Sequence, residues 1–153
     1  MKKLIHQLKY KNNQEVGAFL GNWFGKKLLE SDKFNDIDYI IPVPLHKKKL
    51  IQRGYNQLTK FGEKLSEIFC IQYIENVLIR TSTANTQTFK KRIERFKNLE
   101  TKFSVSNLDL LNNKHILLID DVVTTGATLE ACCKELLKAK NVKISIITLA
   151  LTE

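Results

Sequence analysis

A run of four aliphatic residues, Ile116–Ile119, is the feature that most constrains the fold of this chain. A strand with one face in solvent alternates apolar and polar residues, so an unbroken apolar run is typical of a strand covered on both faces. Such strands belong to parallel sheets, whose faces are covered by the helices that connect the strands. The run therefore predicts a buried strand within an α/β fold.

Other segments supply the expected neighbours of this strand. Tyr39–Pro44 is a short apolar run with two prolines, which predicts a buried strand that runs into a loop, and Val142–Leu151 is a β-branched last strand. Shorter strands are expected at Ile74–Ile79 and Phe103–Val105. Apolar residues at helical spacing predict helices at about residues 13–30, 58–69 and 128–140. We therefore expect a parallel central sheet with helices on both faces.

The length of 153 residues fits one domain. We expect a single domain over residues 1–153, with a small N-terminal helical part at 1–35 and an α/β core at 36–153. Gly17, Gly21 and Gly25 lie one turn apart on the first helix, which favours close approach of another backbone. A membrane dimer motif is disfavoured because the apolar stretch around them is short and contains lysines.

The chain has three cysteines, and none of them stands at a metal-ligand spacing. They are Cys70, Cys132 and Cys133. Reduced thiols in a cytoplasmic protein are the plain interpretation, and the N-terminus does not resemble a signal peptide. We therefore expect a cytoplasmic protein with no membrane contact and with no metal bound by protein ligands alone.

The segment after the aliphatic run carries the strongest chemical signal. Asp120 and Asp121 follow the predicted strand, and Gly126 precedes the predicted helix. Hydroxyl donors come from Thr124, Thr125 and Thr128. A helix start exposes unpaired N–H groups that favour a phosphate, and a glycine lets the backbone approach a ligand closely. Carboxylates at a strand end can accept hydrogen bonds from ribose hydroxyls or help to place Mg²⁺. The order predicts a ligand with both a sugar and a phosphate.

Two alternatives compete with this interpretation. The first treats Asp121 as a turn residue and Thr128 as an ordinary helix cap. It explains one or two residues but not the whole order of acids, threonines and glycine from Asp120 to Thr128. A magnesium site of the nucleoside-triphosphatase kind also places acids after a strand, but no Gly-x-x-x-x-Gly-Lys-Ser/Thr loop occurs in the sequence. A Gly-x-Gly-x-x-Gly dinucleotide fingerprint is absent as well.

The net charge of +9 is concentrated in two segments. Pro44–Gln57 contributes +4 and Arg80–Lys102 contributes +5, because the remaining 14 basic and 14 acidic residues cancel. Both segments are expected to be non-helical or to flank loops, where binding residues often lie. The concentration predicts an anionic partner. The alternative is a solvated basic surface that only aids solubility.

The order Asp-Asp-Val-Val-Thr-Thr-Gly-Ala-Thr resembles the phosphoribosyl-pyrophosphate signature of the type I phosphoribosyltransferases. Pro-Val-Pro-Leu at 42–45 and Arg-Gly-Tyr-Asn-Gln at 53–57 narrow the resemblance to the competence protein F (ComF) family. The resemblance implies that Asp120 and Asp121 contact ribose hydroxyls and act in any catalysis. It implies that the 5-phosphate is held by Thr124, Thr125, Gly126, Ala127 and Thr128.

The resemblance also gives the basic segments candidate roles. Residues 44–53 are expected as the loop that receives pyrophosphate with Mg²⁺, and residues 80–98 as a mobile loop that closes over the ligand. The candidate contacts to pyrophosphate or to DNA phosphate are Lys47, Lys48, Lys49, Arg53 and Arg95. A solvated helix is the alternative for residues 80–98. Many ComF members carry a four-cysteine zinc ribbon ahead of this region, and no such cysteines occur here.

Three hypotheses about function follow from the resemblance. The first is a ComF-like protein that binds 5-phosphoribosyl-1-pyrophosphate (PRPP) with Mg²⁺ and acts in DNA uptake during natural transformation, with single-stranded DNA as a partner. The second is an active phosphoribosyltransferase that moves phosphoribose to a nitrogen base in nucleotide metabolism or salvage. The third is an interaction module for a DNA-uptake helicase. No base-binding motif is found in the sequence.

Overall fold

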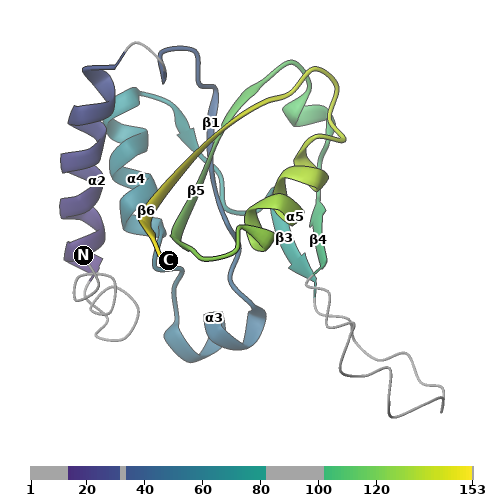
Figure 1. Ribbon diagram of the computed structural model, residues 1–153, viewed down its shortest axis with the longest axis horizontal. Coiled ribbons are helices and arrows are strands. Elements are labelled where there is room, and N and C mark those ends of the chain that lie inside the picture. The colour runs from purple at the N-terminus through teal and green to yellow at the C-terminus, as the bar shows by residue number, and fades with distance from the viewer. Residues whose placement is uncertain (1–13, 32–33, 82–101, 153) are drawn as a thin grey trace.

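The computed structural model describes residues 14–31, 34–81 and 102–152 (Figure 1). The helices are α2 (Gln14–Leu29), α3 (Lys47–Arg53), α4 (Thr59–Phe69), the 3-10 helix η3 (Asp109–Leu111) and α5 (Ala127–Leu136). The strands are β1 (Tyr39–Pro42), β2 (Gln72–Tyr73), β3 (Leu78–Thr81), β4 (Lys102–Val105), β5 (His115–Val123) and β6 (Lys143–Leu151).

The central sheet has four strands in the order β2-β1-β5-β6, and all neighbouring pairs are parallel. In register, Leu118 of β5 lies between Ile41 of β1 and Ile146 of β6. Every residue from His115 to Asp121 is buried. This confirms a strand covered on both faces within a parallel sheet, which the unbroken aliphatic run predicts.

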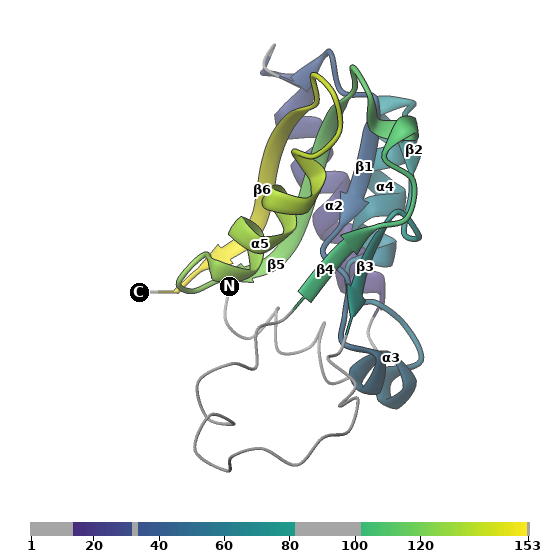
Figure 2. The same cartoon turned by 90° about the vertical axis from the view of Figure 1, so that its right-hand side faces the viewer.

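Helices cover both faces of the sheet, as expected (Figures 1 and 2). On one face, α2 and α4 pack on the sheet through Leu20, Phe61 and Leu65, which cluster with Leu117 and Ile119. On the other face, Leu118 clusters with Cys132 and Leu136 of α5 and with Phe103 of β4. Alternate residues of β5 thus enter different cores, because successive side chains of a strand point to opposite faces.

The expected strand at Ile74–Ile79 is wrong as a single element. The chain bends at Glu75 and Asn76, which are exposed, and the two halves join different sheets. The first half pairs with β1, where the Ile74 N–H donates to the Ile40 carbonyl, and the second half becomes β3. Strands β3 and β4 form a separate antiparallel pair. Two polar residues in succession break the apolar pattern and allow the bend.

Helices α2 and α4 approach each other closely at two glycines. A Cβ atom at Gly21 would lie 2.7 Å from the Phe61 carbonyl oxygen, and one at Gly25 would lie 2.5 Å from Ile68 Cδ1. The close approach of another backbone that the glycine series predicts is confirmed at Gly21, whereas at Gly25 the close neighbour is a side chain. No helix in the described part of the chain is long and apolar enough to cross a membrane.

The basic segment after β1 contains a short helix, so the expectation of a loop over residues 44–53 is wrong for its second part. Helix α3 is capped at both ends: the His46 side chain accepts from the Lys48 N–H at 3.2 Å, and Gly54 ends the helix with a φ of 76°. A capped start and a left-handed glycine end allow a helix of only two turns. The cap also occupies His46 Nδ1.

The amino-terminal end of the sheet is held by a network of charged side chains. His115 is buried and contacts Asp36 Oδ1 and Ser145 Oγ, each at 2.8 Å. Lys143 Nζ lies 2.7 Å from Asp36 Oδ2, and the two hydrogen bonds from Lys143 and His115 lower the pKa of Asp36 to about 2. The network joins β5 and β6 to the turn before β1.

Asp36, His115 and Ser145 contact one another in the order carboxylate, imidazole and hydroxyl, as in the catalytic triad of a hydrolase. Their surroundings differ from those of such a triad. Ser145 lies inside β6 opposite Leu117 of β5, and helices α2, α4 and α5 begin at the other end of the sheet (Figure 1). No helix N-terminus among these therefore faces the Ser145 hydroxyl to stabilise an oxyanion. The contacts serve to fix the strands.

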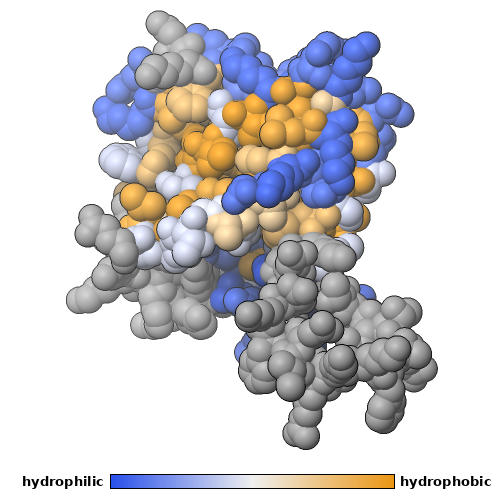
Figure 3. Space-filling view, turned by 45° about the vertical axis from the view of Figure 1, so that its right-hand side comes forward, coloured by the Kyte–Doolittle hydropathy of each residue, from blue (hydrophilic) through white to orange (hydrophobic). Residues whose placement is uncertain are grey.

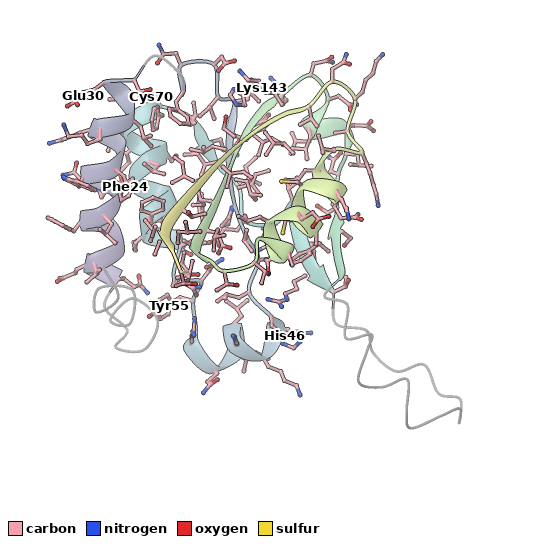
Figure 4. The ribbon with its side chains drawn as sticks, viewed as in Figure 1. Phe24, Glu30, His46, Tyr55, Cys70 and Lys143 are labelled. Atoms are coloured by element: carbon pink, nitrogen blue, oxygen red, sulfur yellow. The ribbon has the colours of Figure 1, made fainter. Side chains whose placement is uncertain are left out.

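Apolar side chains also reach the surface of the described residues. The most exposed large ones are Ile51, Leu151, Phe19 and Leu137. Figure 3 shows apolar side chains in the middle of one face, with hydrophilic side chains around its upper rim. That rim lies toward the end of the molecule where Figure 4 labels Lys143. On this face hydrophilic side chains thus lie at the amino-terminal end of the sheet, and a band of them also crosses the apolar area (Figure 3).

Candidate functional site

The loop between β5 and α5 forms a pocket at the carboxyl end of the sheet. The pocket is lined by Asp120 and by every residue from Val122 to Leu129. Helix α3 lies at the same end of the molecule, as do the end of β3 and the start of β4 (Figure 2). Ligands of open α/β sheets bind at the carboxyl ends of strands, so the position agrees with a ligand site.

Gly126 sets the geometry of the phosphate-type part of the pocket. It is the N-cap residue of α5 with a φ of 79°, a left-handed conformation that glycine adopts without strain. The Ala127 N–H reaches Thr125 Oγ1 at 3.4 Å, and Thr128 lies in the first helical turn. The alternative that Thr128 is the helix cap is therefore wrong. The first residues of α5 line the pocket, and the unpaired N–H groups at the start of a helix suit an anion.

The two acids lie within β5 and not after its end, which corrects the sequence-based expectation. Strand β6 continues alongside, so Asp120 pairs with Thr148 and Val123 pairs with Leu151. Asp120 and Asp121 are 8% and 6% exposed. A buried strand position also excludes the alternative that Asp121 is a turn residue.

Because they are neighbours in a strand, the two carboxylates point to opposite faces of the sheet. Asp120 lies on the α5 side with Leu118, where it lines the pocket. Burial, assisted by the negative charge of Asp120, raises the pKa of the Cys132 thiol in α5 to about 12. Cys132 is therefore an unreactive core residue. Burial also raises the pKa of Cys133.

Asp121 lies on the α4 side, where it meets the segment that precedes α4. Gln57 Nε2 donates to Asp121 Oδ2 at 2.9 Å, and Arg53 Nη1 donates to Gln57 Oε1 at 2.9 Å. Gln57 is buried, with 6% of its surface exposed. Gln57 belongs to the Arg-Gly-Tyr-Asn-Gln stretch, but no feature of the sequence predicts a role for its side chain. Only the fold shows that this stretch meets β5.

Asn56 fixes the same segment from the other direction. Its side chain donates to the Val43 carbonyl at 3.4 Å and accepts from the Leu58 N–H at 3.1 Å. The Val43 N–H in turn donates to the Ile119 carbonyl at 2.9 Å. The chain after β1 and the chain before α4 are thus both tied to β5 next to the acids.

Helix α3 presents exposed cations at this end of the sheet. Lys47, Lys48 and Lys49 are exposed, and Figure 4 places His46 and Tyr55 at the two sides of the same helix. Arg80, the first residue of the second basic segment, lies in β3, and its guanidinium is 5.7 Å from the centre of the Phe103 ring. The prediction for Arg95 and for the rest of residues 82–101 lies outside the described residues.

Comparison with known proteins gives the class first. The phosphoribosyl transferase domain matches residues 60–153, and the chain belongs to this family. The fold is that of glutamine PRPP amidotransferase from B. subtilis, with a TM-score of 0.60 at 16% identity over 95% of this chain and 30% of that one. It is also that of an adenine phosphoribosyltransferase, with a TM-score of 0.53 at 15% identity over 85% of this chain and 67% of that one.

Relatives then narrow the class to the ComF-like branch, which confirms the resemblance seen in the sequence. "DNA utilization protein YhgH" of Escherichia coli O157:H7 is 32% identical over 88% of this chain and 60% of its own length. "Competence protein ComFC" of Bacillus subtilis is 30% identical over 97% of this chain and 59% of its own. "Competence protein F" of Haemophilus influenzae is 28% identical over 96% and 66%. The chain thus spans about 60% of the length of the first of these relatives.

Proposed function

We propose that this chain binds PRPP, together with Mg²⁺, in the pocket at the carboxyl end of β5. The observation that carries the proposal is the shared lining of one pocket by the Asp120 carboxylate and the start of α5. A carboxylate accepts hydrogen bonds from ribose hydroxyls. The N–H groups at a helix start with a left-handed glycine donate hydrogen bonds to a phosphate. Thr124, Thr125 and Thr128 add hydroxyl donors for the same phosphate.

The donor set suits Mg²⁺ that arrives with its ligand. No group of three His, Cys, Asp or Glu side chains able to hold a metal is found among the described residues. Magnesium commonly binds one or two carboxylates together with substrate phosphates, and keeps several waters. Asp120 offers a carboxylate in the pocket, and PRPP brings the phosphates. The ion would neutralise part of the charge on the pyrophosphate.

The cations of α3 provide the second part of the proposed site. Lys47, Lys48, Lys49 and Arg53 would receive the pyrophosphate of PRPP or the phosphates of single-stranded DNA. Arg95 stays a prediction for the same role. Concentrated positive charge attracts any dense polyanion, so the lysines alone do not choose between the two ligands.

The biological role we propose is in DNA uptake during natural transformation, in the cytoplasm. Its support is the naming of relatives as competence and DNA utilization proteins. Single-stranded DNA and a DNA-uptake helicase are the partners that this role requires. Binding to a single strand would combine cations with stacking on exposed aromatic side chains.

An active phosphoribosyltransferase is the second candidate, and the family match favours it. In that reaction the bond from C1 of ribose to pyrophosphate breaks, the pyrophosphate leaves with both bonding electrons, and a nitrogen base bonds to C1. The α3 cations would stabilise the departing charge, and Asp120 would hold the ribose. Pyrophosphate release from PRPP, measured with and without bases and single-stranded DNA, distinguishes this candidate from a binding protein.

Calorimetry with PRPP tests the binding proposal. We expect Mg²⁺-dependent binding to the wild type and an affinity lower by about 10-fold or more in a chain with both Asp120→Asn and Asp121→Asn. A chain with Glu63→Gln and Glu67→Gln on the exposed side of α4 loses the same charge and should bind as the wild type does. Equal affinity of the Asp120/Asp121 variant and the wild type would sink the proposal.

DNA binding has its own test, the dependence of affinity on salt. Replacing Lys47, Lys48 and Lys49 with Ser should reduce the slope of log K against log salt by about 2, since each phosphate contact on a single strand contributes roughly 0.7. The matched control replaces Lys134, Lys138 and Lys140, which lie on or after α5. Binding that keeps its slope without the α3 lysines would place the DNA elsewhere.

A further inference from the structure

We propose that the two adjacent carboxylates have different tasks: Asp120 contacts the ligand, whereas Asp121 is a positioning residue that holds Arg53 through Gln57. This inference rests on the proposed PRPP site and divides the work within it. The acid pair of the sequence signature would otherwise be taken as two equivalent ribose ligands.

The first step of the argument is the direction of the side chains. Asp120 shares its face of β5 with Leu118 and lines the pocket, while Asp121 shares its face with Ile119 and α4. A ligand seated on the Thr124–Thr128 loop therefore lies on the side of the sheet to which Asp120 points. The Asp120 carboxylate also accepts the Asp121 N–H at 2.8 Å, which fixes its rotamer beside the pocket.

The second step is the orientation of the Gln57 amide. An ionised carboxylate only accepts hydrogen bonds, so Asp121 requires the NH₂ group of Gln57 to face it. The Oε1 atom of Gln57 must then face the other way, and it is this atom that accepts from Arg53 Nη1. Without an acceptor at position 121, nothing in this pair of contacts would keep the amide from turning over.

The third step is where this places the cation. Arg53 is the last residue of α3, directly before the left-handed Gly54, and it is half-buried. Its guanidinium is thus held by a hydrogen bond to the buried Gln57 side chain, in contrast to the exposed lysines of the same helix. A guanidinium that is already oriented loses less conformational entropy when it binds a phosphate group. Asp121 acts on anion binding through this chain of two hydrogen bonds.

Calorimetry with two probes separates the two tasks: PRPP with Mg²⁺ contains the ribose, and inorganic pyrophosphate with Mg²⁺ lacks it. Asp120→Asn should weaken PRPP about 10-fold or more, because a hydrogen bond from the ribose to a charged group is lost, and should weaken pyrophosphate less, because pyrophosphate loses only the contact of Asp120 with Mg²⁺. Gln57→Leu should weaken both probes by a factor no larger than that of Arg53→Met, because it removes the orientation of the cation but not the cation itself. A chain with both Gln57→Leu and Arg53→Met should bind each probe no more weakly than the weaker-binding of the two single variants, because both changes act on the same contact.

Position 121 provides the decisive pair of variants. Asp121→Asn keeps an oxygen that can accept from Gln57, so both affinities should stay within about 3-fold of the wild type. Asp121→Leu removes the acceptor and should reproduce the Gln57→Leu result. Since Asp121→Leu can fail to fold, thermal melting of each variant is recorded first, and Gln57→Leu stands in its place if it does.

Each outcome decides between the possibilities. A loss of PRPP affinity in Asp121→Asn as large as that in Asp120→Asn would show two ribose ligands and overturn the division. Gln57→Leu that melts lower but binds both probes normally would show a merely structural contact, which also overturns it. A wild type that fails to bind PRPP would instead remove the proposed function on which the division rests.

Discussion

The two ends of the central sheet both contain charged side chains but use them differently. At the amino-terminal end, Lys114 pairs with Asp38 at 2.9 Å and Lys143 with Asp36 at 2.7 Å. At the carboxyl end, none of the ion pairs formed within the described ranges involves Lys47, Lys48 or Lys49. At the amino-terminal end these lysines are paired with carboxylates of the protein, whereas at the carboxyl end the lysines of α3 keep exposed positive charge.

The difference indicates what each end does. Paired charges at the amino-terminal end fix the turn before β1 to β5 and β6, so their contribution is to the stability of the fold. Clustered cations at the carboxyl end repel one another and are stabilised when an anion binds. The same end holds the start of α5 and the pocket of Asp120. Mutations at the two ends should therefore separate binding from stability.

The largest effect should come from the backbone of the proposed phosphate loop. Gly126→Val should lower PRPP affinity on the order of 100-fold, because a β-branched residue cannot adopt the left-handed conformation and several charge-assisted hydrogen bonds would be misplaced. Asn113→Val is the matched control, since Asn113 also has a positive φ, of 57°, but lies before β5 at the other end of the sheet. The control should lose stability and keep its affinity. Equal losses of affinity in both variants would contradict the comparison.

A smaller effect, and of the opposite kind, is expected at the amino-terminal end. His115→Leu removes the buried imidazole that contacts Ser145 and Asp36, of which Asp36 keeps Lys143, and should lower the free energy of unfolding by about 1–3 kcal/mol. PRPP affinity measured on the folded variant should stay unchanged. Lys143→Met removes an exposed contact to the same Asp36 and should lower the free energy of unfolding less than His115→Leu does. A His115 variant of full stability would show that the network contributes nothing.

A few-fold effect is expected when two anions compete for the carboxyl end. Both PRPP and single-stranded DNA are drawn to Lys47–Lys49, so saturating PRPP should weaken DNA binding partially, and DNA should weaken PRPP by the same factor. Fluorescence anisotropy at matched ionic strength, with and without PRPP and Mg²⁺, measures this factor. Identical DNA affinities in the two titrations would rule out a shared patch.

The smallest effect concerns pH and Asp36. Its pKa in the folded chain is lowered to about 2 by Lys143 and His115, from 3.8. Its stabilising contribution is therefore present above about pH 4 and is lost as the pH falls toward 2. The difference in unfolding free energy between the wild type and Asp36→Asn should shrink between pH 5 and pH 2 in urea titrations. A difference that does not change with pH would contradict the assigned contacts.

Much of this architecture is predictable from local patterns in the sequence. The aliphatic run of β5, the β-branched run of β6 and the helical spacing before Leu29 each depend on neighbours along the chain. The helix at Lys47–Arg53 was missed because its signals are two caps, His46 and Gly54, and not an apolar stripe. Caps stabilise a short helix without leaving any apolar periodicity to detect.

The division of the acid pair shows the limit of motif reasoning. The pattern Asp-Asp-Val-Val-Thr-Thr-Gly places the loop correctly, but it does not tell whether the strand continues through the acids. Pairing with β6 extends β5 to Val123, and this extension turns Asp120 and Asp121 to different faces. The contact from Gln57 to Asp121 joins residues 64 positions apart. Such a contact depends on the packing of α4 on the sheet, which no local pattern records.

Hydrogen exchange tests the central claim, that the carboxyl end binds PRPP and the amino-terminal end does not, most directly. With Mg²⁺ and saturating PRPP, peptides that cover Val122–Leu129 should exchange more slowly, because the N–H groups at the start of α5 would donate to phosphate. Peptides that cover Asp36–Tyr39 and Asn112–Lys114 should exchange at the same rate with and without the ligand. Unchanged exchange over Val122–Leu129 at saturating PRPP, or protection confined to the amino-terminal end, would contradict the account.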